Sequence, residues 1–166
     1  MIAPARMPVR IERMNADDVA AVAAIEGPTR LTEEQLRGEL ERPWARLWVA
    51  SEAGYGVVAF AVAWHVTDEI HLLNVATRAD RQRRGIARGL LGGLLDYARE
   101  VRARHVLLEV RRSNVAAIGL YRQLGFFAMG VRARYYPDDE DAVEMVLAFD
   151  AEGAIVPGSD EVRLHG

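Results

Sequence analysis

The sequence of 166 residues contains no cysteine and no lysine. Without cysteine there is no disulfide framework, no thiolate nucleophile and no cysteine-based zinc site. Without lysine, Schiff-base chemistry and a Walker-type phosphate loop are both excluded, because each depends on that residue. The histidines show no metal-ligand spacing, so we expect no bound metal; they are His65, His71, His105 and His165.

Positive charge is not in excess either. The formal net charge is −3, whereas a domain that binds nucleic acid is normally basic overall. No apolar run approaches the roughly 20 residues that cross a membrane, and the first residues show no signal-peptide pattern. We therefore expect a cytoplasmic protein with no nucleic-acid or membrane partner, and the sequence carries no indication of its oligomeric state.

Apolar periodicity predicts a mixed α/β fold. Alternating or continuous apolar runs predict strands at residues 9–14, 47–51, 57–66, 70–77, 105–111, 126–136 and 142–149. Helical periodicity and capping residues predict helices at 15–26, 32–42, 85–104 and 115–124. We expect about seven strands in one twisted mixed sheet, flanked by about four helices, with a parallel strand–helix–strand crossover at its centre.

The composition is that of an ordinary globular protein, with 51% hydrophobic and 27% charged residues. Neither an internal repeat nor an interdomain linker is visible. We expect residues 1–150 to form a single domain. Residues 151–166 have little apolar periodicity, and we expect them to form a mobile C-terminal tail.

The most informative stretch is an arginine-rich loop after the predicted strand 70–77. Five arginines crowd into eleven positions: Arg78, Arg81, Arg83, Arg84 and Arg88. A loop that leads from a strand into a helix N-terminus gathers free backbone N–H groups and the positive end of the helix dipole. Gly85 lets the backbone approach an anion closely, and Ala87 keeps the same turn free of bulk. We therefore predict that a phosphate or pyrophosphate binds there.

This loop stands in a longer pattern of motifs. The pattern comprises Gln-x-x-Gly-x-Ala at 82–87, Leu-Glu-Val-Arg at 108–111, Ser-Asn at 113–114, Ala-x-x-Leu-Tyr at 117–121 and Leu-Gly-Phe at 124–126. With these motifs the chain resembles the GNAT acetyltransferases over roughly residues 68–149. The resemblance is closest to the RimI-type branch, which acetylates the N-terminal amine of a small-subunit ribosomal protein.

The resemblance implies an acyltransferase that takes its acetyl group from acetyl-CoA. The pyrophosphate-binding residues of the family then correspond to Arg83, Arg84, Gly85, Ile86, Ala87 and Arg88. The strand that contacts the pantetheine corresponds to Val75, Ala76 and Thr77, and the cofactor-binding asparagine to Asn114. The resemblance also implies that Glu109 is the general base, that Tyr121 is the proton donor, and that the N–H of Val75 or Ala76 polarises the thioester oxygen.

Two of these residues can be judged from their own sequence context. Glu109 is a charged residue within the apolar run 106–110, where partial burial would raise its pKa and suit a base; it is equally consistent with a solvated or arginine-paired position on one sheet face. Tyr121 lies two helical turns after Asn114 and therefore on nearly the same helix face. Its phenol is either a proton donor or a core aromatic ring that packs with Ile118 and Leu124.

The acceptor is less clearly indicated than the donor. The pair Tyr135 and Tyr136 either lines a peptide-binding slot or consists of ordinary exposed hairpin aromatics. Residues 27–32 lack the Phe-Pro-Trp-like segment that the RimI-type branch commonly carries in this region. The leading hypothesis is a protein N-terminal amine as acceptor, including that of a ribosomal protein. The alternatives are a small amine, such as a polyamine, aminoglycoside or amino acid, and a CoA-binding regulatory module without turnover.

Overall fold

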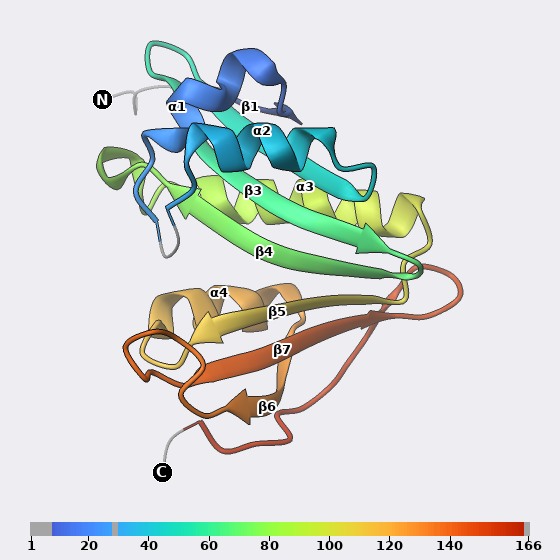
Figure 1. Cartoon of the computed structure of the whole chain (residues 1–166). Coiled ribbons are helices and arrows are strands. Elements are labelled where there is room, and N and C mark those ends of the chain that lie inside the picture. Colours follow the sequence, from blue (N-terminus) through green and yellow to red (C-terminus); the bar gives the residue numbers. More distant parts are fainter. Residues whose placement is uncertain (1–7, 28–29, 165–166) are drawn as a thin grey trace, which may run out of the picture. The chain divides into compact units, whose positions relative to one another are not determined.

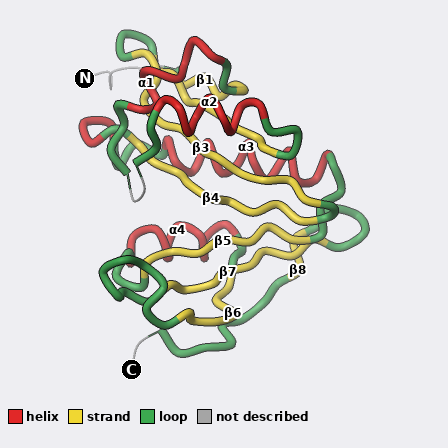
Figure 2. The backbone as a smooth tube through the Cα atoms, in the orientation of Figure 1, coloured by secondary structure: helices red, strands yellow, loops and turns green. Residues whose placement is uncertain are grey.

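The computed structural model describes residues 8–27 and 30–164 of the chain (Figures 1 and 2). His165, and residues 28 and 29 of the segment 27–32, lie outside the described residues. The elements are β1 (Val9–Arg13), α1 (Val19–Ala23), α2 (Glu33–Glu41), β2 (Ala45–Glu52), β3 (Gly56–Val66), β4 (Glu69–Thr77), α3 (Ile86–Glu100), β5 (His105–Arg111), α4 (Val115–Leu124), β6 (Phe127–Arg132), β7 (Ala142–Phe149) and β8 (Ile155–Val156).

The predicted mixed α/β fold is confirmed. The strands belong to one sheet with the order β1-β2-β3-β4-β5-β7-β6, and β8 pairs with β7, so the sheet has one strand more than we predicted. The chain divides into two compact units. Among the described residues, unit 1 contains 8–27, 30–64 and Asn74–Leu94, and unit 2 contains His65–Leu73 and 95–164.

In unit 1, the antiparallel strands β1, β2 and β3 are flanked by helices on both faces (Figure 1). One face carries α1 and α2 and holds an apolar core to which Val22, Leu36 and Phe60 belong. The other face carries the first half of α3. A Cβ on Gly89 or Gly93 would lie 3.2 or 3.4 Å from the side chain of Ile11 on β1. Glycine at position 89 is therefore explained by the close approach of this helix to the sheet.

In unit 2, the first half of β4 pairs in parallel with β5, as the predicted crossover requires, and β5, β7 and β6 are antiparallel. The helix α4 lies along β5 and β7 (Figure 1). The side chains on β5 alternate between the two sheet faces. Val106, Leu108 and Val110 are buried, whereas His105 and Leu107 are half-buried on the opposite face.

Most predicted element ends lie within two residues of the observed ends, with three exceptions. The predicted helix 15–26 is a 3₁₀ turn at Ala16–Asp18 followed by α1, which ends at Ala23. The helix α3 ends at Glu100, before the predicted residue 104, because Arg102 adopts a left-handed φ of 58° and the N–H of Ala103 donates to the carbonyl of Ala98 (2.9 Å). The strand β6 ends at Arg132, before the predicted residue 136, because the chain turns at Arg134, which has a φ of 54°.

The segment after residue 150 covers the edge of the sheet. The strand β8 pairs with β7, and beyond it the N–H of Glu161 donates to the carbonyl of Ala128 on β6 (2.8 Å). The N–H of Ala128 in turn donates to the carboxylate of Asp160 (3.0 Å), which also forms an ion pair with Arg122 on α4. This segment thereby satisfies backbone groups that an edge strand would otherwise expose. Its predicted mobility and the domain boundary at residue 150 stay predictions.

Candidate active site

Two arginines of the crowded loop after β4 have structural partners. The guanidinium of Arg81 is buried, binds the carboxylate of Glu52 at two points and lies over the ring of Tyr55, 3.8 Å from its centroid. The hydrogen bond from Arg81 lowers the pKa of Glu52. Arg78 forms an ion pair with Asp80 (2.7 Å) and donates to the carbonyl of Tyr55 (3.2 Å). These two arginines anchor the loop to the β2–β3 hairpin.

The remaining part of the loop has the geometry of an anion site. Arg83 and Gly85 both have left-handed backbone angles, with φ of 62° and 79°, and both residues are exposed. A Cβ on Gly85 would meet nothing within 4 Å, so there is open space in front of the backbone at this point. The N–H of Gly89 donates to the carbonyl of Gly85 (3.0 Å). The amides of Ile86 and Ala87 therefore precede the hydrogen-bond ladder of α3, as an anion-binding helix N-terminus requires.

The end of β4 lies in the same unit as this loop. Val75 and Thr77 are half-buried, Ala76 is buried, and the side-chain amide of Gln82 donates to the carbonyl of Thr77 (3.3 Å). A Cβ on Gly27 would lie only 2.6 Å from the Cβ of Ala76, so the chain that leaves α1 passes close over the strand end. Unit 1 thus brings together the predicted phosphate loop and the predicted pantetheine strand.

The predicted catalytic residues both lie in unit 2. Glu109 on β5 is exposed, whereas its neighbours Leu108 and Val110 are buried. Of the two positions that the sequence left open for Glu109, partial burial and a solvated place on one sheet face, the structure shows the solvated one. Because side chains alternate along a strand, Glu109 points to the face that α4 does not cover, and its apolar neighbours Leu108 and Val110 point to the opposite face.

Tyr121 is almost fully buried on α4, where its ring meets the ring of Phe126 edge-on at a centroid distance of 5.6 Å. Burial raises the pKa of Tyr121 to about 12, and nearby Tyr136 adds to the effect. The phenol consequently keeps its proton throughout the neutral and mildly alkaline range. Both interpretations of this residue, core aromatic and proton donor, are compatible with such a position.

Asn114 caps the helix that carries Tyr121. Its side-chain oxygen accepts a hydrogen bond from the N–H of Ala117 (3.2 Å), and the helix ends at Gly125, which has a φ of 111°. The side-chain NH₂ group of Asn114 is not used by this cap and can donate to a ligand carbonyl. The two tyrosines after β6 form an edge-to-face pair at 5.1 Å, and the guanidinium of Arg111 lies over the ring of Tyr136 at 4.1 Å.

Two residues near Glu109 were not identified from the sequence. Glu144 on β7 lies directly opposite Glu109 in the strand register, and Arg132 on β6 forms an ion pair with Glu144. The signal that could have found Glu144 is the one that drew attention to Glu109, a single carboxylate within an apolar strand. Arg132 could not be found in this way, because its partner is set by the pairing of β6 with β7.

No group of three or more His, Cys, Asp or Glu side chains that could hold a metal ion occurs within residues 8–27 and 30–164. Over the same residues, none of the helices has both the length and the apolarity needed to cross a membrane.

Comparison with known proteins identifies related sequences and structures. Residues 14–126 match the model of the acetyltransferase (GNAT) family. The ribosomal protein bS18-alanine N-acetyltransferase of Escherichia coli strain K12 is 39% identical over 119 residues, which cover 63% of this chain and 80% of that protein. A putative enzyme of the same name from Bacillus subtilis strain 168 is 30% identical over 140 residues, covering 81% of this chain and 92% of that protein.

Solved structures show the same fold. The crystal structure of the ribosomal-protein-S18-alanine N-acetyltransferase from Escherichia coli has a TM-score of 0.78 and 31% identity, and the alignment covers 93% of this chain and 97% of that chain. The crystal structure of Ard1 from Thermoplasma volcanium has a TM-score of 0.76 and 26% identity, with 90% and 99% of the two chains covered.

Proposed function

This chain belongs to the GNAT acetyltransferase family and is an acetyl-CoA-dependent N-acetyltransferase, and we propose that the amine it acetylates is the N-terminal α-amino group of a protein. Relatives with 30–39% identity are named for acetylation of an alanine of ribosomal protein bS18, which makes a ribosomal protein the first acceptor to test. The observation that carries the proposal is the exposed carboxylate of Glu109, which stands alone between buried residues of β5.

In this proposal the arginine loop holds the donor. The amides of Ile86 and Ala87 and the guanidinium groups of Arg83, Arg84 and Arg88 bind the pyrophosphate, and the open space at Gly85 admits it close to the backbone. Val75, Ala76 and Thr77 hold the pantetheine arm, and the family resemblance gives Asn114 a cofactor-binding role. When bound, acetyl-CoA supplies the thioester whose acetyl carbon forms the new bond to nitrogen while its bond to sulfur breaks.

The residues of unit 2 then move the protons. An α-amino group has an ordinary pKa of about 7.7–8.0, so it is mostly protonated at neutral pH but loses its proton readily. The carboxylate of Glu109 accepts that proton, directly or through a water molecule, and the amine becomes nucleophilic. Tyr121, whose phenol is protonated at neutral pH, donates its proton to the departing sulfur, and its oxygen then recovers a proton from the second one that the acetylated nitrogen releases.

The test is release of free CoA thiol and mass spectrometry of products, with peptides that carry a free N-terminus beside spermidine, an aminoglycoside and free amino acids. We expect acetylation of the peptides at their α-amino groups. Glu109→Gln should lower kcat by about a hundredfold and leave the affinity for CoA nearly unchanged. Glu152→Gln is the matched control, because Glu152 is an exposed carboxylate in the loop between β7 and β8.

Acetylation of small amines alone would contradict the proposed acceptor. Tight binding of acetyl-CoA without thiol release from any acceptor would instead favour a regulatory CoA-binding module.

A further inference from the structure

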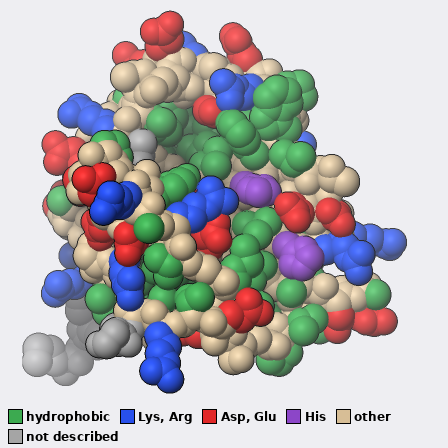
Figure 3. Space-filling view, turned by 60° about the horizontal axis from the view of Figure 1, so that its bottom comes forward, with side chains coloured by type: hydrophobic (Ala, Val, Ile, Leu, Met, Phe, Trp, Pro, Cys, Tyr) green, Lys and Arg blue, Asp and Glu red, His purple; other side chains and the backbone are tan. Residues whose placement is uncertain are grey.

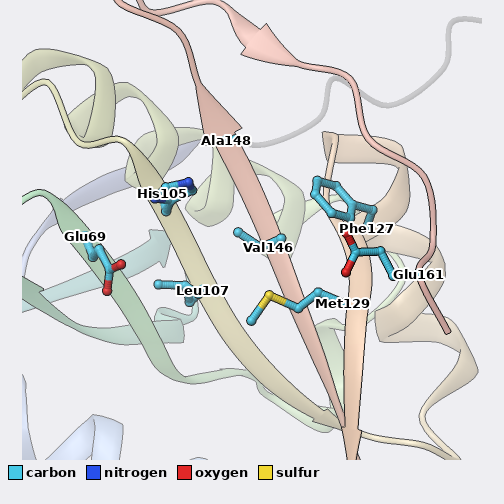
Figure 4. Close-up of a pocket in the computed structure, with 8 residues that line it drawn as sticks. All are labelled: Glu69, His105, Leu107, Phe127, Met129, Val146, Ala148 and Glu161. Carbon is cyan, nitrogen blue, oxygen red and sulfur yellow. The ribbon is translucent and has the colours of Figure 1, made fainter.

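A cavity of about 310 Å³ opens on one face of the unit 2 sheet, beside the segment that follows β8 (Figure 4). Its lining comes from four strands and that segment: Glu69, His105, Leu107, Phe127, Met129, Val146, Ala148 and Glu161. The floor is apolar, and Met129 is 37% exposed, so apolar surface is presented to solvent. Figure 3 likewise shows hydrophobic side chains at the surface among acidic, basic and histidine side chains.

The cavity continues the sheet face that carries Glu109. In the register of β5 with β7, Glu109 lies opposite Glu144, Leu107 opposite Val146, and His105 opposite Ala148. Residues two apart in a strand point to the same face, so these three pairs form successive rows on one surface. The last row lies about 13 Å from the first, at roughly 3.3 Å per residue.

The two sides of the cavity carry negative charge. Figure 4 shows Glu69 and Glu161 on opposite sides, with Leu107, Val146 and Met129 between them. Glu69 is held by His71, whose Nε2 lies 3.1 Å from the carboxylate. Glu161 is exposed, and its backbone is fixed by the bond from its N–H to Ala128 (2.8 Å). Neither arginine nor lysine is among the lining residues. An apolar floor between two carboxylates is complementary to a polypeptide segment with both apolar and basic side chains.

We propose that this cavity binds the acceptor polypeptide itself, a few residues downstream of the acetylated amine, and selects apolar and basic side chains there. The inference rests on the proposed function, because it takes Glu109 as the place where the α-amino group reacts. An extended chain advances about 3.3–3.6 Å per residue. The third residue of the acceptor then lies over the Leu107–Val146 row, and the fourth and fifth reach the space between Glu69 and Glu161.

The proposal is tested by steady-state kinetics with six-residue peptides that share the same first three residues, Ala-Ala-Ala. They continue as Arg-Arg-Leu, Glu-Glu-Leu or Gly-Ser-Gly, and a three-residue Ala-Ala-Ala amide serves as the short acceptor. We expect KM for the basic peptide to be about tenfold lower than KM for the neutral and the short acceptors, since two exposed ion pairs contribute about 0.2–1 kcal/mol each. KM for the acidic peptide should be higher than KM for the neutral one. The value of kcat should change less than twofold.

The variant Glu69→Gln/Glu161→Gln should abolish the difference in KM between the basic and acidic peptides and leave the rate with the three-residue acceptor unchanged. Glu152→Gln, which removes an exposed carboxylate elsewhere in unit 2, should keep the difference. Equal KM for all peptides in the wild-type protein would overturn the proposal that the cavity binds the acceptor, and so would an undiminished preference for the basic peptide in the double variant. Neither result would contradict the acetylation of N-termini. Failure to acetylate any peptide would overturn both proposals.

Discussion

Glu109 on β5 and Glu144 on β7 lie directly opposite each other across an antiparallel strand pair. Like charges in this arrangement destabilise a sheet, because their Cβ atoms are only about 4.5–5.5 Å apart. Arg132 forms an ion pair with Glu144, and its pKa is raised chiefly by the hydrogen bond to Glu144 and in part by the charge of Glu109. The cation of Arg132 therefore offsets the repulsion between the proposed base and its neighbour.

Substitution of Arg132 should destabilise this part of the sheet. In Arg132→Gln the two carboxylates face each other without a cation, so we expect the free energy of unfolding to fall by about 1 kcal/mol. The measurement is urea denaturation of the variant and the wild-type protein at neutral pH. Arg132→Gln/Glu144→Gln should recover most of the lost stability, and unchanged stability in the single variant would rule out this role of Arg132.

Removal of the Tyr121 hydroxyl should slow the transfer step. Tyr121→Phe keeps the ring against Phe126, so we expect the fold to be retained and kcat to fall by about a hundredfold, as for the loss of a general acid. Since burial raises the pKa of Tyr121 to about 12, the wild-type rate should show no alkaline decline due to this group below about pH 10. The control is Tyr97→Phe, which removes a hydroxyl bonded to His65 (2.8 Å). If both variants retain full kcat, Tyr121 is a core aromatic residue and does not act as the proton donor.

The arginine loop should discriminate between ligands by their phosphates. Arg83→Ala/Arg88→Ala is expected to weaken CoA binding by about tenfold for each charge-assisted hydrogen bond that is removed, with little effect on dephosphorylated pantetheine. Calorimetric titration with both ligands measures this. Arg102→Ala, an exposed arginine of unit 2, is the control with unchanged affinity. An equal weakening for CoA and pantetheine would show that these arginines do not bind phosphate.

The segment after residue 150 should contribute to stability through Asp160. Asp160→Ala removes both the acceptor for the N–H of Ala128 and the ion pair with Arg122. We expect the free energy of unfolding to fall by about 1–2 kcal/mol, whereas Arg122→Ala, which removes only the ion pair, should cost about 0–1 kcal/mol. Urea denaturation of both variants separates the two contributions. Identical stability of Asp160→Ala and the wild-type protein would mean that this segment does not hold the edge of β6.

Much of the fold could be predicted because its signals are local. Thr32 and Gln35 cap α2 reciprocally, with hydrogen bonds of 2.8 and 3.1 Å, and Asn114 caps α4 as its position in the sequence suggests. Strand β5 and helix α4 begin and end where periodicity placed them. By contrast, β8 is only two residues long, and a pairing that short leaves no periodic signal.

The candidate site was predictable in its residue types but not in their partners. All five arginines of the loop looked alike in the sequence, yet Arg81 forms a buried ion pair with Glu52, which is 29 residues away in the chain. The sequence left open whether Glu109 is partly buried or solvated, and only the packing of the sheet shows that its apolar neighbours Leu108 and Val110 face the other side.

The sequence by itself determined the order of strands and helices, the glycine-containing helix start and the family, because these depend on neighbouring residues and on motif spacing. The tertiary structure alone decided which arginines remain exposed, that Glu144 lies opposite Glu109 and pairs with Arg132, and that the chain after residue 150 borders a cavity with an apolar floor and acidic sides. The physical reason is that ion pairs, strand register and cavities join residues far apart in the chain, and the free energy that selects them arises only when the sheet is assembled.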